Sequence, residues 1–203
     1  WSSYVCSSDL VFEPAPVLFQ NLLKQTEGLA HLIEDLRVVS SYGGAGYTLT
    51  LSETDLEATI RSVLDNFLPE FQRAHFTITT ELEHQQCFCD PLRIMQCLTV
   101  LFDNALKYAS SRSLRVKNGI AGKENFILVE DSGPGISEER QGLLFQPFQR
   151  GEQARKSNPE GCGLGLSVVR AIMLAHGGNA TYCQTQEKHS IFKISWPVSQ
   201  EKQ

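Results

Sequence analysis

The stretch FILVEDSGPGIS, residues 126–137, joins a run of apolar residues to an acidic pair and then to a turn in which two glycines flank a proline. A short apolar run bounded by turn residues is typical of a buried strand, so Asp131 is predicted to end that strand. Asp-Ser-Gly alone would make a turn. The additional glycine, Gly135, indicates a loop whose backbone adopts a positive φ or is approached closely by another molecule.

Two more glycine clusters lie downstream, GCGLG at residues 161–165 and HGG at residues 176–178. In GCGLGLSVV the glycines lead directly into a predicted helix, whose first N–H groups and positive dipole end would face the loop. Such an end suits a phosphate group. Glycine turns are common, so this cluster alone does not define a site.

A predicted helix, MQCLTVLFDNALKYAS (residues 95–110), carries a cluster of polar and aromatic residues. The spacing i, i+3, i+4 places Asn104, Lys107 and Tyr108 on one face of it. An amide oxygen, a cation and an aromatic ring together suit a metal, a phosphate and a purine. For this helix taken alone, an amphipathic surface helix with a solvated lysine is the simpler interpretation.

The overall composition is that of an ordinary globular protein. The chain has 203 residues, is 41% hydrophobic and 20% charged, and carries a formal net charge of −5, which argues against a general nucleic-acid binder. No apolar run approaches the length of a membrane span. The six cysteines contain no CxxC pair, which favours free thiols over a zinc site or a disulfide scaffold.

The chain divides into three parts. Residues 1–16 are expected to be a disordered or non-native leader. Residues 17–42 are predicted to form one long helix, because apolar residues recur at alternating spacings of four and three: Leu18, Leu22, Leu29, Leu32, Leu36 and Val39, with Gln25 in the one polar position. Such a narrow apolar stripe requires a partner helix. Residues 48–199 are predicted to form one α+β domain, joined through a hinge at residues 41–47.

Within this domain the pattern predicts a two-layer α/β sandwich, with helices on one face of a largely antiparallel mixed sheet. The expected elements are a strand at residues 48–51, a helix capped by Ser52, strands at 76–82 and 87–89, a helix from Pro91 to Ala109 capped by Asp90, a hairpin of LRVKNG and FILVED, a helix from Leu164 to His176, and a final strand pair of ATYCQT and IFKISWP.

Four of these segments resemble the conserved boxes of sensor histidine kinases, in the family's order and spacing. DNALKYA is similar to the N-box, EDSGPGIS to the G1 box, LFQPFQRGE to the F-box and GCGLGLSVVRAIMLAHGG to the G2 box. The resemblance covers residues 17–197. It implies the GHKL, or Bergerat, ATP-binding fold, and it identifies the preceding helix as the second helix of the dimerisation and phosphotransfer hairpin.

The resemblance also implies roles for individual residues. Asp131 would accept a hydrogen bond from the adenine amino group, and Gly133 and Gly135 would leave room for the base. Asn104 would ligate Mg²⁺, Lys107 would pair with phosphate oxygens, and both would serve catalysis. The other residues expected to contact the nucleotide are Tyr108, Ile136, Phe148, Gly161, Gly163, Leu164, Gly165 and Leu166. Residues 149–160 would form a mobile lid that Phe145 and Phe148 dock onto the domain.

The sequence departs from the family pattern at three places. The family's acceptor histidine is usually followed by an acidic residue, whereas the five histidines here are followed by Leu, Phe, Gln, Gly and Ser. His31, on the helical segment, is expected to be a solvated surface residue. Val100 stands where the N-box commonly has a second asparagine, which would reduce metal affinity or turnover. In the last hairpin, Ser190 would stand in for a threonine.

The function implied is that of the ATP-binding catalytic part of a sensor histidine kinase, which transfers the γ-phosphoryl group of Mg·ATP to a histidine for relay to an aspartate of a response regulator. The acceptor helix is expected to lie outside this chain. The intact protein would be a homodimer through its helical hairpin, with a cytoplasmic catalytic domain and a bacterial inner-membrane anchor in other segments. Two alternatives are a nucleotide-binding scaffold or regulator phosphatase, and a GHKL ATPase or anti-sigma kinase.

Overall fold

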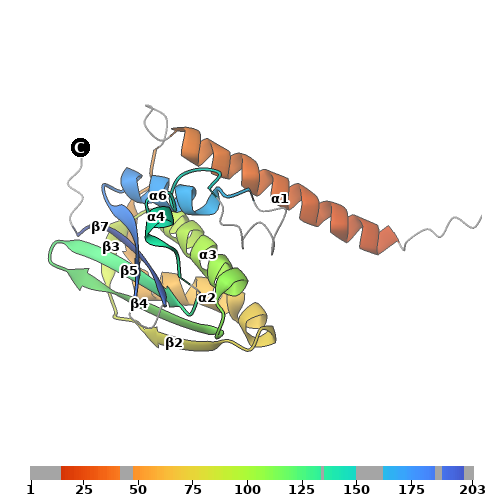
Figure 1. Cartoon of the computed structure of the whole chain (residues 1–203). Helices are drawn as coiled ribbons and strands as arrows, with labels where there is room; N and C mark the ends of the chain where they lie inside the picture. Colours follow the sequence, from red (N-terminus) through yellow and green to blue (C-terminus); the bar gives the residue numbers. More distant parts are fainter. Residues whose placement is uncertain (1–14, 42–47, 134, 150–161, 186–188, 199–203) are drawn as a thin grey trace, which may run out of the picture.

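A computed structural model describes residues 15–41, 48–133, 135–149, 162–185 and 189–198 of the chain. A five-stranded mixed sheet forms one layer, and helices α2, α3 and α6 lie on one of its faces (Figure 1). The α+β two-layer arrangement predicted from the sequence is therefore confirmed.

The sheet has the strand order β2-β4-β5-β7-β6. Its strands are β2 (Thr77–Glu81), β4 (Ser113–Ala121), β5 (Glu124–Asp131), β6 (Asn179–Gln184) and β7 (Ser190–Pro197). β2 pairs with β4 in parallel, while the other neighbours are antiparallel, including the predicted β4–β5 hairpin and the final β6–β7 pair. The central strand β5 alternates between buried and half-buried residues, so one of its faces lies in the core.

The helices that cover the sheet are amphipathic: α2 (Leu56–Arg73), α3 (Pro91–Tyr108) and α6 (Gly165–Ala175). Their apolar faces meet the inner face of the sheet in one core, whose largest fully buried side chains include Trp196, Phe71 and Phe102. Phe67 joins α2 to α3 by an edge-on contact with Phe102, with ring centroids 5.8 Å apart. A fourth helix, α4 (Glu138–Gln141), is a single turn after β5.

The start of the domain differs from the prediction. Residues 48–51 are not a strand; β1 is Ser52–Asp55, and it pairs antiparallel with β3 (Gln86–Cys89) in a separate two-stranded sheet. The cap of α2 is therefore not Ser52 but Asp55, whose Oδ1 accepts the N–H of Ala58 at 3.0 Å. The predicted cap of α3 is confirmed, since Asp90 Oδ1 accepts the N–H of Arg93 at 3.2 Å.

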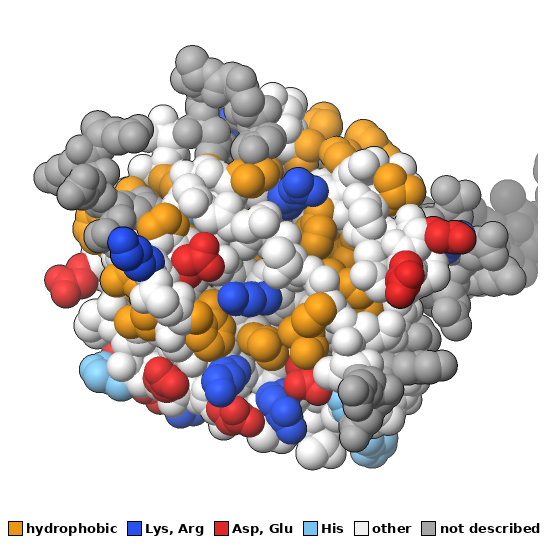
Figure 2. Space-filling model, turned by 60° about the vertical axis from the view of Figure 1, so that its left-hand side comes forward, with side chains coloured by type: hydrophobic (Ala, Val, Ile, Leu, Met, Phe, Trp, Pro, Cys, Tyr) orange, Lys and Arg blue, Asp and Glu red, His pale blue; other side chains and the backbone are white. Residues whose placement is uncertain are grey.

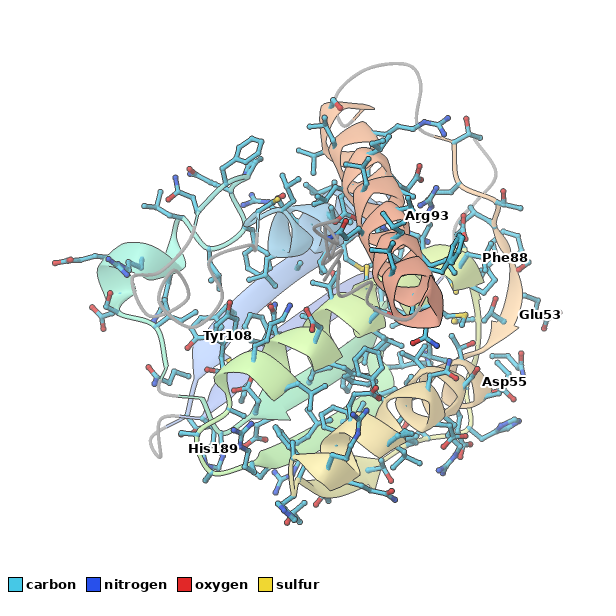
Figure 3. The ribbon with its side chains drawn as sticks, turned by 90° about the vertical axis from the view of Figure 1, so that its right-hand side faces the viewer. Glu53, Asp55, Phe88, Arg93, Tyr108 and His189 are labelled. Carbon is cyan, nitrogen blue, oxygen red and sulfur yellow. The ribbon has the colours of Figure 1, made fainter. Side chains whose placement is uncertain are left out.

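Helix α1 (Ala15–Ser41) extends away from the domain and touches it near its C-terminal end (Figure 1). Val38 is buried there, and Glu34 forms a 3.0 Å ion pair with Arg93 of α3. In Figure 3, Arg93 lies beside α1, at the opposite end of α3 from Tyr108. None of the helices in the described ranges is both long enough and apolar enough to cross a membrane.

The face of the molecule drawn in Figure 2 is mixed in character. Figure 2 shows basic and acidic side chains interspersed with hydrophobic ones on one face of the molecule.

On β3, Cys87 and Cys89 both point into the core, with their Sγ atoms 3.8 Å apart. They are buried free thiols.

Candidate functional site

Asp131, the last residue of β5, is a buried carboxylate at the end of the sheet. Its Oδ1 accepts the N–H of Gly133 at 2.7 Å. Burial raises the pKa of Asp131 to about 6, although the Gly133 N–H and the nearby His189 favour the charged form. The strand therefore ends, as FILVED predicted, at Asp131. The carboxylate of this residue is buried, and it accepts a single hydrogen bond from the described residues.

A polar row continues from Asp131 across the neighbouring strands. Ser190 of β7 lies directly opposite Asp131, and Gln184 of the edge strand β6 lies opposite Ser190. Ser190 is also buried, and its hydroxyl is 3.4 Å from that of Tyr182. The residue expected to replace the family's threonine therefore stands beside the carboxylate.

Both glycines of the loop after Asp131 are required by close contacts. A Cβ at Gly133 would lie 2.6 Å from Asp131 Oδ1 and 3.2 Å from Ser190 Oγ. Gly135 has a φ of +75°, and a Cβ there would lie 1.6 Å from Gln184 Nε2. Gly133 thus leaves room for the Asp131 side chain itself, and Gly135 for the side chain of Gln184.

The last two turns of α3 carry the three residues that the sequence placed on one helix face. Tyr108, half-buried, ends the helix beside this loop, since its carbonyl oxygen is 3.7 Å from the Cβ position of Gly133. Asn104 is half-buried, and its side chain forms no hydrogen bond with the described residues. Lys107 forms an ion pair with Asp103, one turn earlier in the helix, rather than extending alone into solvent.

The N-terminus of α6 lies against α3. Gly165 is the first residue of α6, and its Cβ position is 3.0 Å from Val100 Cγ1, one turn before Asn104. Gly163 has a φ of +72°, and the N-cap residue Leu164 gives the helix no side-chain cap. Within the described residues, the N-cap position thus supplies no side-chain cap to the first N–H groups of α6, and such N–H groups can donate hydrogen bonds to a ligand. Leu166 is half-buried against the core, and Gly161 lies outside the described residues.

Residues 143–149 connect α4 to this region. Phe145 is buried in the core. Phe148 is 64% exposed, has a φ of +62°, and donates its N–H to the carbonyl of Gly163 at 3.0 Å. Phe148 thus contacts the loop before α6 through its backbone N–H. The proposed lid, apart from Gln149, lies outside the described residues.

Two site residues were not predicted from the sequence, Tyr182 and Gln184 of β6. Tyr182 accepts the N–H of Ile136 through its hydroxyl at 3.1 Å, across 46 positions of sequence. The alternation of ATYCQT predicted a strand, but nothing local to it indicates which loop that strand would meet.

Comparison with known proteins assigns the family. The family model described as "Histidine kinase-, DNA gyrase B-, and HSP90-like ATPase" matches residues 89–200. The chain belongs to this family. All four of the motif segments lie within the matched residues, and so do Asn104, Asp131 and Gly165.

The relatives of this ATPase domain carry the names of sensor proteins and sensor histidine kinases. It is 32% identical over 180 residues to the sensor protein RstB of Escherichia coli, covering 88% of this chain and 41% of RstB. It is 36% identical over 132 residues to the sensor histidine kinase YkoH of Bacillus subtilis, covering 65% of this chain and 29% of YkoH. The chain thus spans less than half the length of these curated relatives.

A solved structure agrees with this assignment. The structure of the histidine kinase AdeS of Acinetobacter baumannii superposes with a TM-score of 0.76 at 34% identity, over 95% of this chain and 89% of that one. The resemblance to sensor histidine kinases and the GHKL ATP-binding fold, both predicted from the sequence, are confirmed.

Proposed function

We propose that this ATPase domain binds Mg·ATP through Asp131, the end of α3 and the start of α6, as the catalytic part of a two-component sensor histidine kinase. The observation that supports this most is the buried carboxylate of Asp131 at the end of β5, beside Tyr108. A carboxylate accepts a hydrogen bond from the amino group of adenine, whereas guanine presents a carbonyl oxygen at that position. The site would therefore select adenine.

The remaining residues fit the other parts of the nucleotide. Asn104 has an amide oxygen without a partner among the described residues, and Mg²⁺ favours oxygen ligands. Lys107 would exchange Asp103 for a phosphate oxygen, and the uncapped N–H groups of α6 would donate to the phosphate chain. When bound, Mg·ATP supplies the phosphoryl group and part of the charge neutralisation. The chain's own contribution is positioning.

In the intact kinase we infer that the phosphoryl group passes to a histidine on a helix outside these 203 residues, and then to an aspartate of a response regulator. Helix α1 would pair with its copy in a homodimer, and the domain would work in the cytoplasm of a protein anchored in the bacterial inner membrane by other segments. The support for this is the relationship to the sensor protein RstB and the sensor histidine kinase YkoH.

Asp131→Asn tests adenine recognition. We expect ATP to bind at least tenfold more weakly, because a charge-assisted hydrogen bond is worth about 1.5–3 kcal/mol and the neutral amide keeps only part of it. The variant is expected to fold, since Asn retains an acceptor for the Gly133 N–H and removes a buried charge. Titration with a fluorescent ATP analogue gives the affinity.

Glu124→Gln is the matched control, because Glu124 begins the same strand and is exposed. It should bind ATP as the unmodified protein does. Equal affinity of the Asp131→Asn variant and the unmodified protein would remove the adenine-recognition role.

A second candidate function, a nucleotide-binding scaffold or regulator phosphatase without kinase turnover, is favoured by one observation. Val100 occupies the helix turn before Asn104, and its methyl group lies against Gly165 instead of offering a polar ligand. A separately prepared acceptor hairpin with radiolabelled ATP discriminates between the two functions. Phosphate appearing on the hairpin histidine supports the kinase, and ATP binding without transfer supports the scaffold.

A further inference from the structure

The edge strand β6 holds the glycine loop that follows Asp131. The Ile136 N–H donates to the Tyr182 hydroxyl at 3.1 Å, and the backbone of Gly135 lies so close to Gln184 that no Cβ would fit between them. The loop after Asp131 is thus fixed from two sides, by the Asp131 carboxylate at Gly133 and by β6 at residues 135–136.

Tyr182 itself contacts the neighbouring strand β7 through its ring and its hydroxyl. Its ring packs against Phe192, the residue opposite it on β7, with ring centroids 5.2 Å apart. Its hydroxyl also lies 3.4 Å from the Ser190 hydroxyl. Because Ser190 lies opposite Asp131, the Tyr182 hydroxyl connects the loop to the polar row that contains the carboxylate.

We propose that Tyr182 is a positioning residue for the purine, fixing residues 135–136 at the separation from Asp131 that an adenine ring requires. This inference rests on the proposed function, and it adds a side chain that would not touch the phosphates. The hydroxyl acts by holding one backbone N–H, while the ring acts by packing. The two contributions can therefore be separated with one conservative substitution.

Tyr182→Phe keeps the ring and its contact with Phe192 and removes only the hydroxyl. A purely structural role of the ring predicts unchanged nucleotide affinity. A positioning role predicts about fivefold weaker binding, the typical effect of one hydrogen bond, because the loop would sample more conformations before the base binds. The loss should be the same for adenosine, ADP and ATP, since all three share the base.

Isothermal titration of the whole chain with these three ligands measures the effect, and Thr181→Ser, on the exposed outer face of the same strand, is the control. Equal losses for all three ligands in Tyr182→Phe, with none in Thr181→Ser, are expected. Unchanged affinity overturns the inference, and so does a loss confined to ATP. If the unmodified chain binds none of the ligands, the proposed function fails first, and this inference with it.

Hydrogen exchange of the unmodified protein tests the same contact if the Tyr182→Phe variant does not fold. The Ile136 amide should exchange its hydrogen slowly in the absence of nucleotide, because the Tyr182 hydroxyl accepts it. Exchange of this amide as fast as that of the exposed Ser137 amide would overturn the proposed contact.

Discussion

At the scale of single residues, Asp131 combines two properties that oppose each other. Its carboxylate is largely removed from water, which favours the neutral form, yet the hydrogen bond from an amino group is stronger when the carboxylate is charged. Burial raises the pKa of Asp131 to about 6, so the group is ionised at neutral pH and becomes protonated under mildly acidic conditions.

This predicts a pH dependence of base binding. Adenosine should bind well above pH 6 and progressively more weakly below it, losing about tenfold between pH 7.5 and pH 5 as the carboxyl group of Asp131 takes up a proton. Adenosine is preferred to ATP here because phosphate groups titrate in the same range. An NMR titration at several pH values measures the affinity.

The Asp131→Asn variant is the control for this prediction, because its side chain does not titrate. Its affinity should be flat across the range. Parallel pH profiles for the variant and the unmodified protein would show that another group controls binding.

Single residues differ in how far the sequence alone could identify them. Asp131, Asn104 and Gly163 lie in short patterns of charge, amide and glycine whose order and spacing resemble the family's motifs, and this resemblance predicts their roles. Tyr182 and Gln184 do not, because their significance comes from strand pairing that brings β6 next to a loop more than 40 positions away. A contact of that kind has no local signal.

At the scale of elements, the contact of α3 with α6 sets the geometry of the phosphate end of the site. Gly165 faces Val100 where the two helices meet, and a Cβ at Gly165 would lie 3.0 Å from Val100 Cγ1, so the position of the α6 N-terminus depends on the size of the residue at each of the two positions. Val100, where the sequence departs from the family pattern, therefore also affects helix packing. Its Cγ1 methyl group faces Gly165, which has no side chain to clash with it.

A double-mutant cycle tests this contact. Gly165→Ala should lower the free energy of unfolding by about 1 kcal/mol, since the new methyl group meets Val100 Cγ1. In a Val100→Ala background the same change should be neutral or stabilising, because space is available and alanine is a better helix former than glycine. Chemical denaturation gives the four free energies, with an expected coupling of about 1 kcal/mol.

Gly142→Ala serves as the matched control, since nothing lies within 4 Å of its Cβ position and its φ of −63° suits alanine. It should show no coupling to Val100→Ala. A coupling near zero at Gly165 as well would mean that the two helices adjust freely.

The start of α2 is an element boundary that the local sequence pattern placed wrongly. The sequence predicted Ser52 as the cap of α2, because serine followed by acidic residues is a common helix start. Pairing of Ser52–Asp55 with Gln86–Cys89 instead extends these residues as β1 and moves the cap to Asp55. The partner strand lies some 30 positions later, so the local signal was overridden by tertiary pairing.

At the scale of the whole molecule, α1 differs from the helices that cover the sheet, because most of its apolar residues in the described ranges are exposed. The five leucines of its predicted seam are between 37% and 60% exposed, and only the end near Val38 is buried against the domain. An apolar stripe of this length on a solvent-facing helix is typical of an association surface.

We therefore expect the chain to form dimers through α1. The double substitution Leu22→Glu with Leu29→Glu should convert them to monomers, because it places like charges on a seam that would otherwise be apolar. Light scattering coupled to size-exclusion chromatography gives the mass of each form.

Gln20→Glu, an exposed position off the seam, is the control and should leave the dimer intact. A monomeric unmodified chain at all concentrations, or a double variant with unchanged mass, would contradict this role for α1.

Apart from β1 and the cap of α2, the residues of this chain by themselves determined its helices and strands, the mixed sheet, and the chemical character of the groups in the proposed site. Those properties depend on short-range patterns: alternation along strands, helical spacing, and glycine where the backbone must turn. Only the tertiary structure decided that Ser190 stands beside Asp131, that Val100 meets Gly165, and that Tyr182 holds the glycine loop. These contacts join residues distant in sequence, and their geometry depends on strand register and helix packing.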